Sequence, residues 1–377
     1  MSQPIPFIDL QAQRRRLGAP LNDAIQKAVE GGQWILGPQV AQFERDIAAW
    51  AGVKHAIACA YGTDALLLVL RAWGIGPGDA VFVPAFTFAA SGEVVALAGA
   101  VPVFVDVLSD TFNMDPVSLE AAIAMVKKAG DLTPKAIMPV DLFGQPADYR
   151  SIAPIARREG LKMLCDTAQG FGGVMDGKRT GSIGDAAATS FFPAKPLGCY
   201  GDGGACFTND DELKDKLLSL RMHGQGSDRY EHVAIGLNSR LDTIQAAILI
   251  EKLKIFEDEI EKRNLIARRY SEAFAGSNRI KTPPVIEGAV STWAQYTLQV
   301  VDRNKFQSKF KEAGVPTMVY YPIPLSRQPA YAHYPSVPTP VSEALSGHVV
   351  SLPMHPYLDK DTTWPLRASL TGVGTLG

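Results

Sequence analysis

Lys195 stands between Pro193 and Pro196, in a segment that continues into a run of glycines. Each proline fixes its own φ and pushes the preceding residue out of the helical region, so this lysine has a rigid backbone frame. A solvated turn lysine gains nothing from such a frame, although that is the more common case for a lone lysine. A lysine whose amine must meet one atom of a bound molecule gains accurate placement from it.

Asp166 supplies the context that favours the second interpretation. The segment 161–169 is typical of a short buried strand with Asp166 at its carboxyl end, and 185–192 predicts a neighbouring strand that leads to Ser190 and Lys195. Ligands of open α/β sheets bind beyond the carboxyl ends of the strands. An amine and a carboxylate in that place suit pyridoxal phosphate, because the lysine forms a Schiff base and the acid pairs with the pyridine nitrogen. Taken alone, Asp166 is equally well explained as a helix N-cap.

A candidate phosphate site lies earlier in the chain. The pattern predicts a strand over 54–60, a tight turn over 61–65 and a helix over 66–73. Free amides at a helix start bind anions. Gly62 permits close backbone approach and Thr63 adds a hydroxyl, whereas Asp64 suits a phosphate only if it caps the helix. Such turns are common in α/β proteins, and the Gly-Lys-Ser/Thr of a Walker A loop is absent.

Several motifs in the same order resemble the DegT/DnrJ/StrS family of sugar aminotransferases, which are pyridoxal phosphate enzymes of the aspartate aminotransferase fold. The similarity spans nearly the whole chain, from 7–10 to 351–358, and its motifs are 35–38, 62–65, 84–88, 166–169, the Lys195 segment and 238–242. Within the family, the likeness is greatest to enzymes that aminate UDP-2-acetamido-2-deoxy-3-oxo-glucuronate for bacterial surface polysaccharides.

The resemblance implies a role for each matching residue. Lys195 would be the Schiff-base lysine and Asp166 the partner of the pyridine nitrogen. The other cofactor contacts would be Gln169 to the ring hydroxyl, Phe88 stacked on the ring, and a phosphate site of Gly62, Thr63, Asp64 and Ser190. Asn238 would reach the same phosphate from a partner subunit, which implies a homodimer with shared sites. The sugar nucleotide would contact Arg240, Tyr320 and Tyr321.

Some of these residues have simpler explanations. Phe88 lies in an apolar stretch and fits a core position, and Gln169 could simply begin a loop. Ser239 followed by Asp242 resembles a helix N-terminal box, in which case Asn238 and Arg240 only flank a cap. Tyr320 replaces a histidine that relatives usually carry, and a tyrosine cannot become a cation near neutral pH.

The resemblance implies a reaction in which glutamate donates its amino group and a keto group of a nucleotide-linked sugar receives it. The nucleotide could be UDP, dTDP or GDP. A pyridoxal phosphate-binding regulatory protein without turnover is an alternative of another class. Dehydrating relatives carry histidine where this chain has Lys195, and no Gly-x-Gly-x-x-Gly of a nicotinamide enzyme follows the first predicted strand.

Composition limits the partners. Lys and Arg number 37 against 39 Asp and Glu in 377 residues, which argues against nucleic acid as an obligate partner. The four cysteines form no Cys-x-x-Cys pair, and a reducing, cytoplasmic location fits them. The scattered histidines suggest no metal site. The most apolar region, 80–107, is interrupted by Pro84, Glu93, Pro102 and Asp106, so no membrane span is expected.

The order of patterns predicts an α/β fold. Apolar runs at 55–60, 80–84, 101–106, 136–141, 161–165, 186–192 and 204–208 alternate with helical stretches, which indicates a mostly parallel sheet flanked by helices. A long helix is expected from Thr243 to about Phe274. We expect a large domain over 1–250, and a smaller α+β domain over 251–377 with strands near 295–301 and 317–321.

Overall fold

The structure, a computed structural model of the chain, describes residues 5–358. Its largest element is a seven-stranded sheet in the order β1-β9-β8-β5-β4-β2-β3. The strands are β1 (His55–Cys59), β2 (Asp79–Pro84), β3 (Val101–Val105), β4 (Thr133–Ile137), β5 (Lys162–Asp166), β8 (Ala186–Ser190) and β9 (Gly204–Thr208). Each lies at or next to an apolar run of the sequence.

Most neighbouring strands of this sheet are parallel. β3, β2, β4, β5 and β8 run in one direction, and β9 is antiparallel to both β8 and β1. The predicted α/β class with a mostly parallel sheet is therefore confirmed. The run expected over 136–141 is displaced, because β4 begins with the poorly buried residues 133–135 and ends at Ile137. Beyond it, only the bridge from Val140 to Asp166 continues the ladder.

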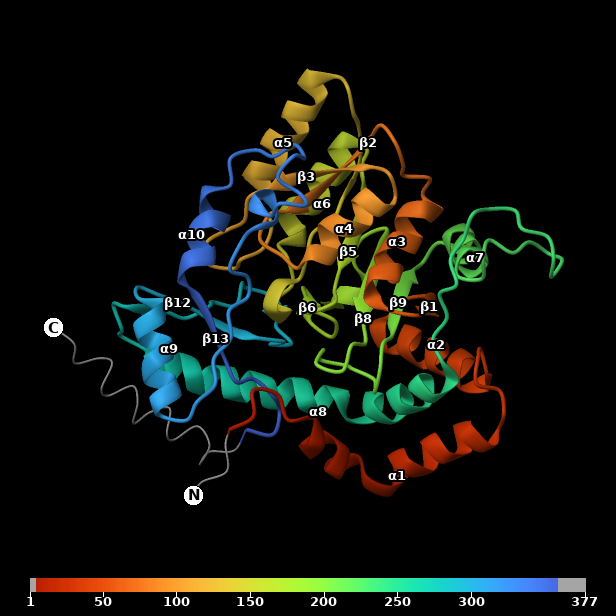
Figure 1. Cartoon of the computed structure of the whole chain (residues 1–377), viewed down its shortest axis with the longest axis horizontal. Helices are drawn as coiled ribbons and strands as arrows, with labels where there is room; N and C mark the ends of the chain where they lie inside the picture. Colours follow the sequence, from red (N-terminus) through yellow and green to blue (C-terminus); the bar gives the residue numbers. More distant parts are fainter. Residues whose placement is uncertain (1–4, 359–377) are drawn as a thin grey trace.

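Helices cover both faces of the sheet, as Figure 1 shows. Alternate strand residues point to opposite faces, so Ala56 and Ala58 join one hydrophobic cluster with α2, α5 and α6, while Ile57 and Cys59 join another with α3, α4 and α7. These helices are α2 (Pro38–Ala51), α3 (Gly62–Ala72), α4 (Ala89–Leu97), α5 (Pro116–Ala129), α6 (Tyr149–Glu159) and α7 (Asp211–Leu220).

The N-terminal helix and a long later helix lie along the base of the molecule in Figure 1. They are α1 (Leu10–Glu30) and α8 (Thr243–Phe274), and the bounds of α8 match the sequence prediction. The chain then forms a small antiparallel sheet in the order β10-β12-β13, with β10 (Ile280–Lys281), β12 (Tyr296–Val300) and β13 (Val349–Leu352). Beside it lie α9 (Arg303–Glu312) and α10 (Pro340–His348).

The expected strand near 295–301 is thus present as β12, whereas the strand expected over 317–321 is wrong. There, only Met318 pairs with Ser351 through an isolated bridge. The division between residues 250 and 251 stays a prediction, and residues 359–377 of the expected second domain lie outside the described residues.

A third small sheet joins β6 (Val174–Met175), β7 (Lys178–Arg179) and β11 (Ala289–Val290), and short 3-10 helices cover Leu142–Gly144, Thr180–Ser182 and Leu325–Arg327.

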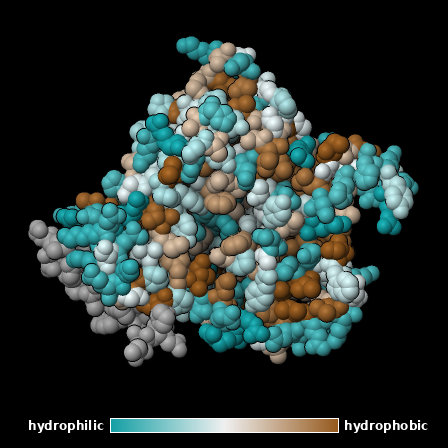
Figure 2. All heavy atoms as spheres, in the orientation of Figure 1, coloured by the Kyte–Doolittle hydropathy of each residue, from teal (hydrophilic) through white to brown (hydrophobic). Residues whose placement is uncertain are grey.

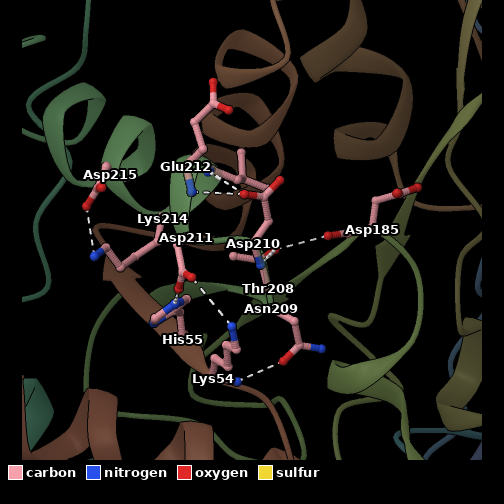
Figure 3. Close-up of polar contacts among 11 residues, drawn as sticks. Lys54, His55, Asp185, Thr208, Asn209, Asp210, Asp211, Glu212, Lys214 and Asp215 are labelled. Atoms are coloured by element: carbon pink, nitrogen blue, oxygen red, sulfur yellow. Dashed lines mark hydrogen bonds and ion pairs between the residues drawn. The ribbon is translucent and has the colours of Figure 1, made fainter.

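Polar contacts fix α7 against the edge of the large sheet (Figure 3). Asp210 caps the helix, since its Oδ1 accepts from the N–H groups of Glu212 at 2.9 Å and Leu213 at 3.2 Å. The next residue, Asp211, lies 2.6 Å from Nε2 of His55, the first residue of β1. Hydrogen bonds thus join the start of α7 to the start of β1.

The surface has both apolar and polar regions. Figure 2 shows hydrophobic residues gathered at the lower right, over the region of α1, α2 and the start of α8, beside a hydrophilic lower edge. Among residues 5–358, no helix combines the length and apolar composition that crossing a bilayer requires.

Candidate active site

A cavity of about 610 Å³ lies beyond the carboxyl ends of β5 and β8, where the first turns of α3 and α4 also meet. Strand β5 ends at Asp166, β8 ends at Ser190, and the two strands pair in parallel, as the sequence predicted. Most of the predicted site residues line this cavity: Gly62, Thr63, Phe88, Asp166, Gln169, Ser190, Lys195, Tyr320 and Tyr321. Asp64, Asn238 and Arg240 do not line it.

The carboxylate of Asp166 is buried and held at both oxygens. Oδ2 accepts a hydrogen bond from the Ser91 hydroxyl at 2.9 Å, and Oδ1 accepts one from the N–H of Ala168 at 3.1 Å. Burial raises the pKa of Asp166, and the two hydrogen bonds and the charge of Lys195 oppose this rise. The carboxylate is therefore oriented and supplied with donors that favour its ionised form.

The Lys195 side chain is half-buried in the wall of the cavity. Its backbone N–H donates to the carbonyl of Phe192 at 2.8 Å, so the lysine sits in a tight turn between the two prolines. Burial lowers the pKa of the Lys195 amine, and the charge of Asp166 opposes this. A lowered pKa leaves more of the amine unprotonated and able to act as a nucleophile.

At the candidate phosphate site, the helix begins four residues earlier than the sequence suggested and lies close against β8. Helix α3 begins at Gly62, directly after Tyr61, and the predicted turn over 61–65 is mostly the first turn of the helix. The N–H groups of Gly62 and Thr63 therefore belong to the positive helix end, which points at the cavity. A Cβ on Gly62 would lie 2.6 Å from Cβ of Ser190, so only glycine lets α3 approach β8 this closely.

Asp64 does not line the cavity, unlike its neighbours Gly62 and Thr63. It is buried, and its carboxylate accepts hydrogen bonds from the Ser239 and Tyr61 hydroxyls. Burial raises the pKa of Asp64, and these hydrogen bonds oppose the rise. Its carboxylate thus links α3 to the segment before α8, and its predicted contact with a phosphate stays a prediction.

The segment before α8 does not contain the helix box that Ser239 and Asp242 suggested. Helix α8 starts at Thr243 with Asp242 as its N-cap residue, and Ser239 Oγ instead accepts from the N–H of Ala60 at 3.2 Å. Asn238 is exposed and Arg240 is half-buried. Neither lines the cavity of its own subunit, so a role for Asn238 from a partner subunit stays a prediction.

Aromatic and amide side chains form another part of the cavity wall. Gln169 Oε1 accepts from the N–H of Phe143 at 2.7 Å, and its Nε2 donates to the Tyr321 hydroxyl at 3.0 Å. Gln169 is therefore not simply the start of a loop. The Phe88 ring is 55 % exposed and lies 6.1 Å from the ring of Tyr321, so the core position considered for Phe88 is wrong. Burial raises the pKa of both Tyr320 and Tyr321.

Several cavity residues were not identified from the sequence. The cavity wall also includes Tyr61, Asp202 and Gln295, and behind it the buried Ser91, which bonds Asp166, lies 3.3 Å from the Thr87 hydroxyl. A hydroxyl in the first turn of a helix that follows an apolar strand was the one available signal for Ser91.

Comparison with known proteins agrees with this geometry. The sequence model of the DegT/DnrJ/EryC1/StrS aminotransferase family matches residues 16–368. UDP-2-acetamido-2-deoxy-3-oxo-D-glucuronate aminotransferase of Pseudomonas aeruginosa is 48% identical over 369 residues, which cover 97% of this chain and 99% of that protein.

Solved structures agree as well. The crystal structure of a DegT DnrJ EryC1 StrS aminotransferase from Brucella abortus has a TM-score of 0.97 at 53% identity, covering 99% of this chain and 100% of that one. The structure of NtdA from Bacillus subtilis, solved with bound cofactor PMP, has a TM-score of 0.88 at 30% identity, covering 100% of this chain and 86% of that one.

Proposed function

The chain belongs to the DegT/DnrJ/EryC1/StrS aminotransferase family, and we propose that it transfers the amino group of glutamate to a keto group of a nucleotide-linked sugar. It has the fold of the pyridoxal phosphate aminotransferases and uses that cofactor. The single observation that carries the proposal is that Asp166, at the end of β5, and Lys195, in the loop after the neighbouring strand β8, line one cavity beside the N-terminus of α3.

The residues around the cavity fit the cofactor. Phosphate matches the first turn of α3, where glycine at position 62 leaves the backbone uncovered. A ring nitrogen matches Asp166, whose two oxygens are already oriented. Pyridoxal phosphate, when bound, supplies an aldehyde that accepts amino groups and a ring that withdraws electrons.

The protein contributes binding, orientation and proton transfer. Asp166, whose two oxygens are held by Ser91 and the N–H of Ala168, would pair with the ring nitrogen and favour its protonated form. Lys195 Nζ would hold the cofactor, and its free amine would move a proton at the reacting carbon. Positioned proton transfer of this kind contributes about 10²–10⁴-fold to a rate.

We further propose a homodimer in which each site is completed by the partner. Three aromatic residues of the cavity wall are about half exposed in the single chain: Tyr61 45 %, Phe88 55 % and Phe192 51 %. A partner subunit that covered these rings would bury apolar surface that the single chain leaves in water. Asn238 is also exposed, as a residue that reaches a partner's site must be. A cytoplasmic location is part of the same proposal.

The proposed sugar substrate is UDP-2-acetamido-2-deoxy-3-oxo-glucuronate. The support for it is the 48% identity to the Pseudomonas aeruginosa enzyme over nearly the full length of both chains. Sugars linked to dTDP or GDP are the competing substrates. The alternative of a regulatory protein without turnover is not favoured, because the cavity holds the full set of residues for proton transfer.

The test is amino transfer from nitrogen-labelled glutamate to a panel of keto-sugar nucleotides, read by product mass. We expect labelled product with the UDP-uronate and none from Lys195→Ala. Borohydride reduction followed by peptide mapping should place the cofactor on residue 195. A tag on another residue, or full activity of Lys195→Ala, would falsify the mechanism. Product from a dTDP or GDP sugar alone would change the assigned substrate and leave the mechanism in place.

A further inference from the structure

A buried cation of α8 contacts the loop that carries Lys195. Lys252 is 1% exposed, and its Nζ donates a hydrogen bond of 2.5 Å to the carbonyl of Gly198. The same ammonium lies 4.4 Å from the centroid of the Tyr200 ring. A buried cation is costly unless it is paired, and here a carbonyl oxygen and a ring face, both from the loop, are its partners.

The carbonyl that Lys252 binds is close to the lysine turn. A Cβ on Gly198 would lie 2.5 Å from the carbonyl oxygens of both Phe192 and Pro193, so Gly198 folds back onto the residues just before Lys195. The N–H of Cys199 donates to the carbonyl of Phe191 at 2.8 Å and closes the loop. A displacement of Gly198 must therefore displace the Lys195 turn.

Helix α8 binds this loop at a second point on the same side. Gln245 Oε1 accepts from the N–H of Tyr200 at 2.8 Å. Gln245 and Lys252 are separated by two helical turns, so both side chains lie on one face of α8. The loop is thus bound by the neutral Gln245 and by the charged Lys252, and Lys252 contacts the position nearer to Lys195 in sequence.

We propose that Lys252 is a positioning residue for the catalytic amine, acting through the carbonyl of Gly198. The inference rests on the proposed function, since it assigns Lys195 the reacting amine. Lys252 touches neither the cavity nor the reacting atoms, and its effect is to hold the backbone on which Lys195 is mounted. The groups that face its ammonium are Glu259 of α8, with Cys199 and Tyr200 of the loop.

The experiment is hydrogen exchange of full-length protein without cofactor, read by mass spectrometry on peptides that cover 191–201. We expect Lys252→Met to accelerate exchange in 191–201 about tenfold while β1 exchanges at the wild-type rate. In the loaded enzyme, we expect kcat to fall about tenfold with KM changed less than about twofold.

The matched control is Lys254→Met, on the same helix. Lys254 is exposed and pairs with Glu251 at 2.6 Å, and its loss should leave both measurements unchanged. Lys252→Arg, which retains a cation, should recover part of the protection.

If residues 191–201 of Lys252→Met exchange as slowly as in the wild type, the proposal is overturned. It is also overturned if β1 of the variant is accelerated as much as 191–201, because that indicates general destabilisation. If Lys252→Met does not fold, Lys252→Gln is judged by the same two outcomes. Because exchange is measured without cofactor, its result stands even if the chain fails to transfer amino groups.

Discussion

The hydroxyl of Ser91 donates a hydrogen bond of 2.9 Å to Oδ2 of Asp166, across 75 positions of sequence. This bond joins the first turn of α4 to the end of β5. It opposes the effect of burial on the Asp166 carboxyl, because a donor stabilises the ionised form.

Replacing Ser91 with alanine should impair catalysis through Asp166. Without the donor, the pKa of Asp166 rises further. As the pH is lowered, Asp166 therefore becomes protonated at a higher pH than in the wild type, and the acid limb of the pH–rate profile shifts to higher pH. Hydrogen bonds to charged groups are worth about 1.5–3 kcal/mol, which corresponds to about a 10- to 100-fold loss of kcat. Rate profiles against pH provide the measurement. Ser151→Ala, which removes an exposed serine bonded to Asp148, is the control, and an unshifted acid limb in Ser91→Ala would contradict the role.

Adding a methyl group at position 62 should reduce cofactor retention. The new Cβ would lie 2.6 Å from Cβ of Ser190, so α3 must move away from β8 and carry its first-turn amides with it. Overpacking of this kind costs about 1–3 kcal/mol, and we expect a cofactor dissociation constant at least about tenfold higher, measured by absorbance titration. Gly347→Ala has open space around it and should bind as wild type does. Unchanged binding by Gly62→Ala would rule out a phosphate site at this helix start.

The buried carboxyl of Asp141 should make stability depend on pH. Burial raises its pKa from 3.8 to about 7, while Tyr149 and the N–H of Ala147 provide its hydrogen bonds. At pH values between 3.8 and about 7, Asp141 is protonated in the folded protein and ionised in the unfolded chain. Proton binding therefore stabilises the fold at low pH, and this contribution is lost as the pH rises through about 7.

Asn at position 141 has nearly the same shape and does not ionise. The free energy of unfolding of Asp141→Asn, relative to wild type, should therefore be higher at pH 8 than at pH 5 by about 2–3 kcal/mol. Urea unfolding at the two pH values provides the comparison, in which other ionisable groups cancel. An identical difference at both pH values would show that Asp141 is ionised throughout.

Tyr320 should affect the sugar substrate and spare the amino donor. Its side chain lines the cavity, and a phenol hydroxyl can donate and accept a hydrogen bond. Tyr320→Phe should raise KM for the nucleotide sugar about 3- to 10-fold, the value of one neutral hydrogen bond, while the reaction with glutamate alone keeps its rate. Tyr331→Phe, outside the cavity wall, is the control. Equal loss in both half reactions would assign Tyr320 to the cofactor instead.

A mixture of two inactive variants should recover activity if the site is shared. A dimer of one Lys195→Ala subunit and one Asn238→Ala subunit contains one fully intact site when Asn238 acts across the interface. Random reassociation of equal amounts then restores about a quarter of wild-type activity. If each site were complete within one chain, mixing would restore nothing.

The residues at strand ends were the most predictable part of the site. Asp166, Ser190 and Lys195 follow from short apolar runs and from the rule that ligands bind beyond the carboxyl ends of strands. Helix α8 was equally clear, because Asp242 precedes a long uninterrupted helical pattern.

Other features depend on contacts that local patterns do not contain. The serine that bonds Asp166 comes from a distant segment, and the direction of the Asp64 side chain is set by Ser239 and Tyr61. The failed strand over 317–321 has a suitable composition, but only Met318 meets a partner strand. Strand formation there depended on a neighbour rather than on propensity.

The reversed direction of β9 decides how the reacting amine is mounted. Because β8 and β9 are antiparallel neighbours, Ser190 at the end of β8 pairs with Gly204 at the start of β9. The connection between them begins and ends at the same end of these two strands and needs no crossover helix. Both ends of this connection are anchored by strand hydrogen bonds a few ångströms apart. Insertions or deletions within the connection would change how far the amine extends over the sheet while leaving the strand order intact, which makes its length a separate variable for redesigning the enzyme.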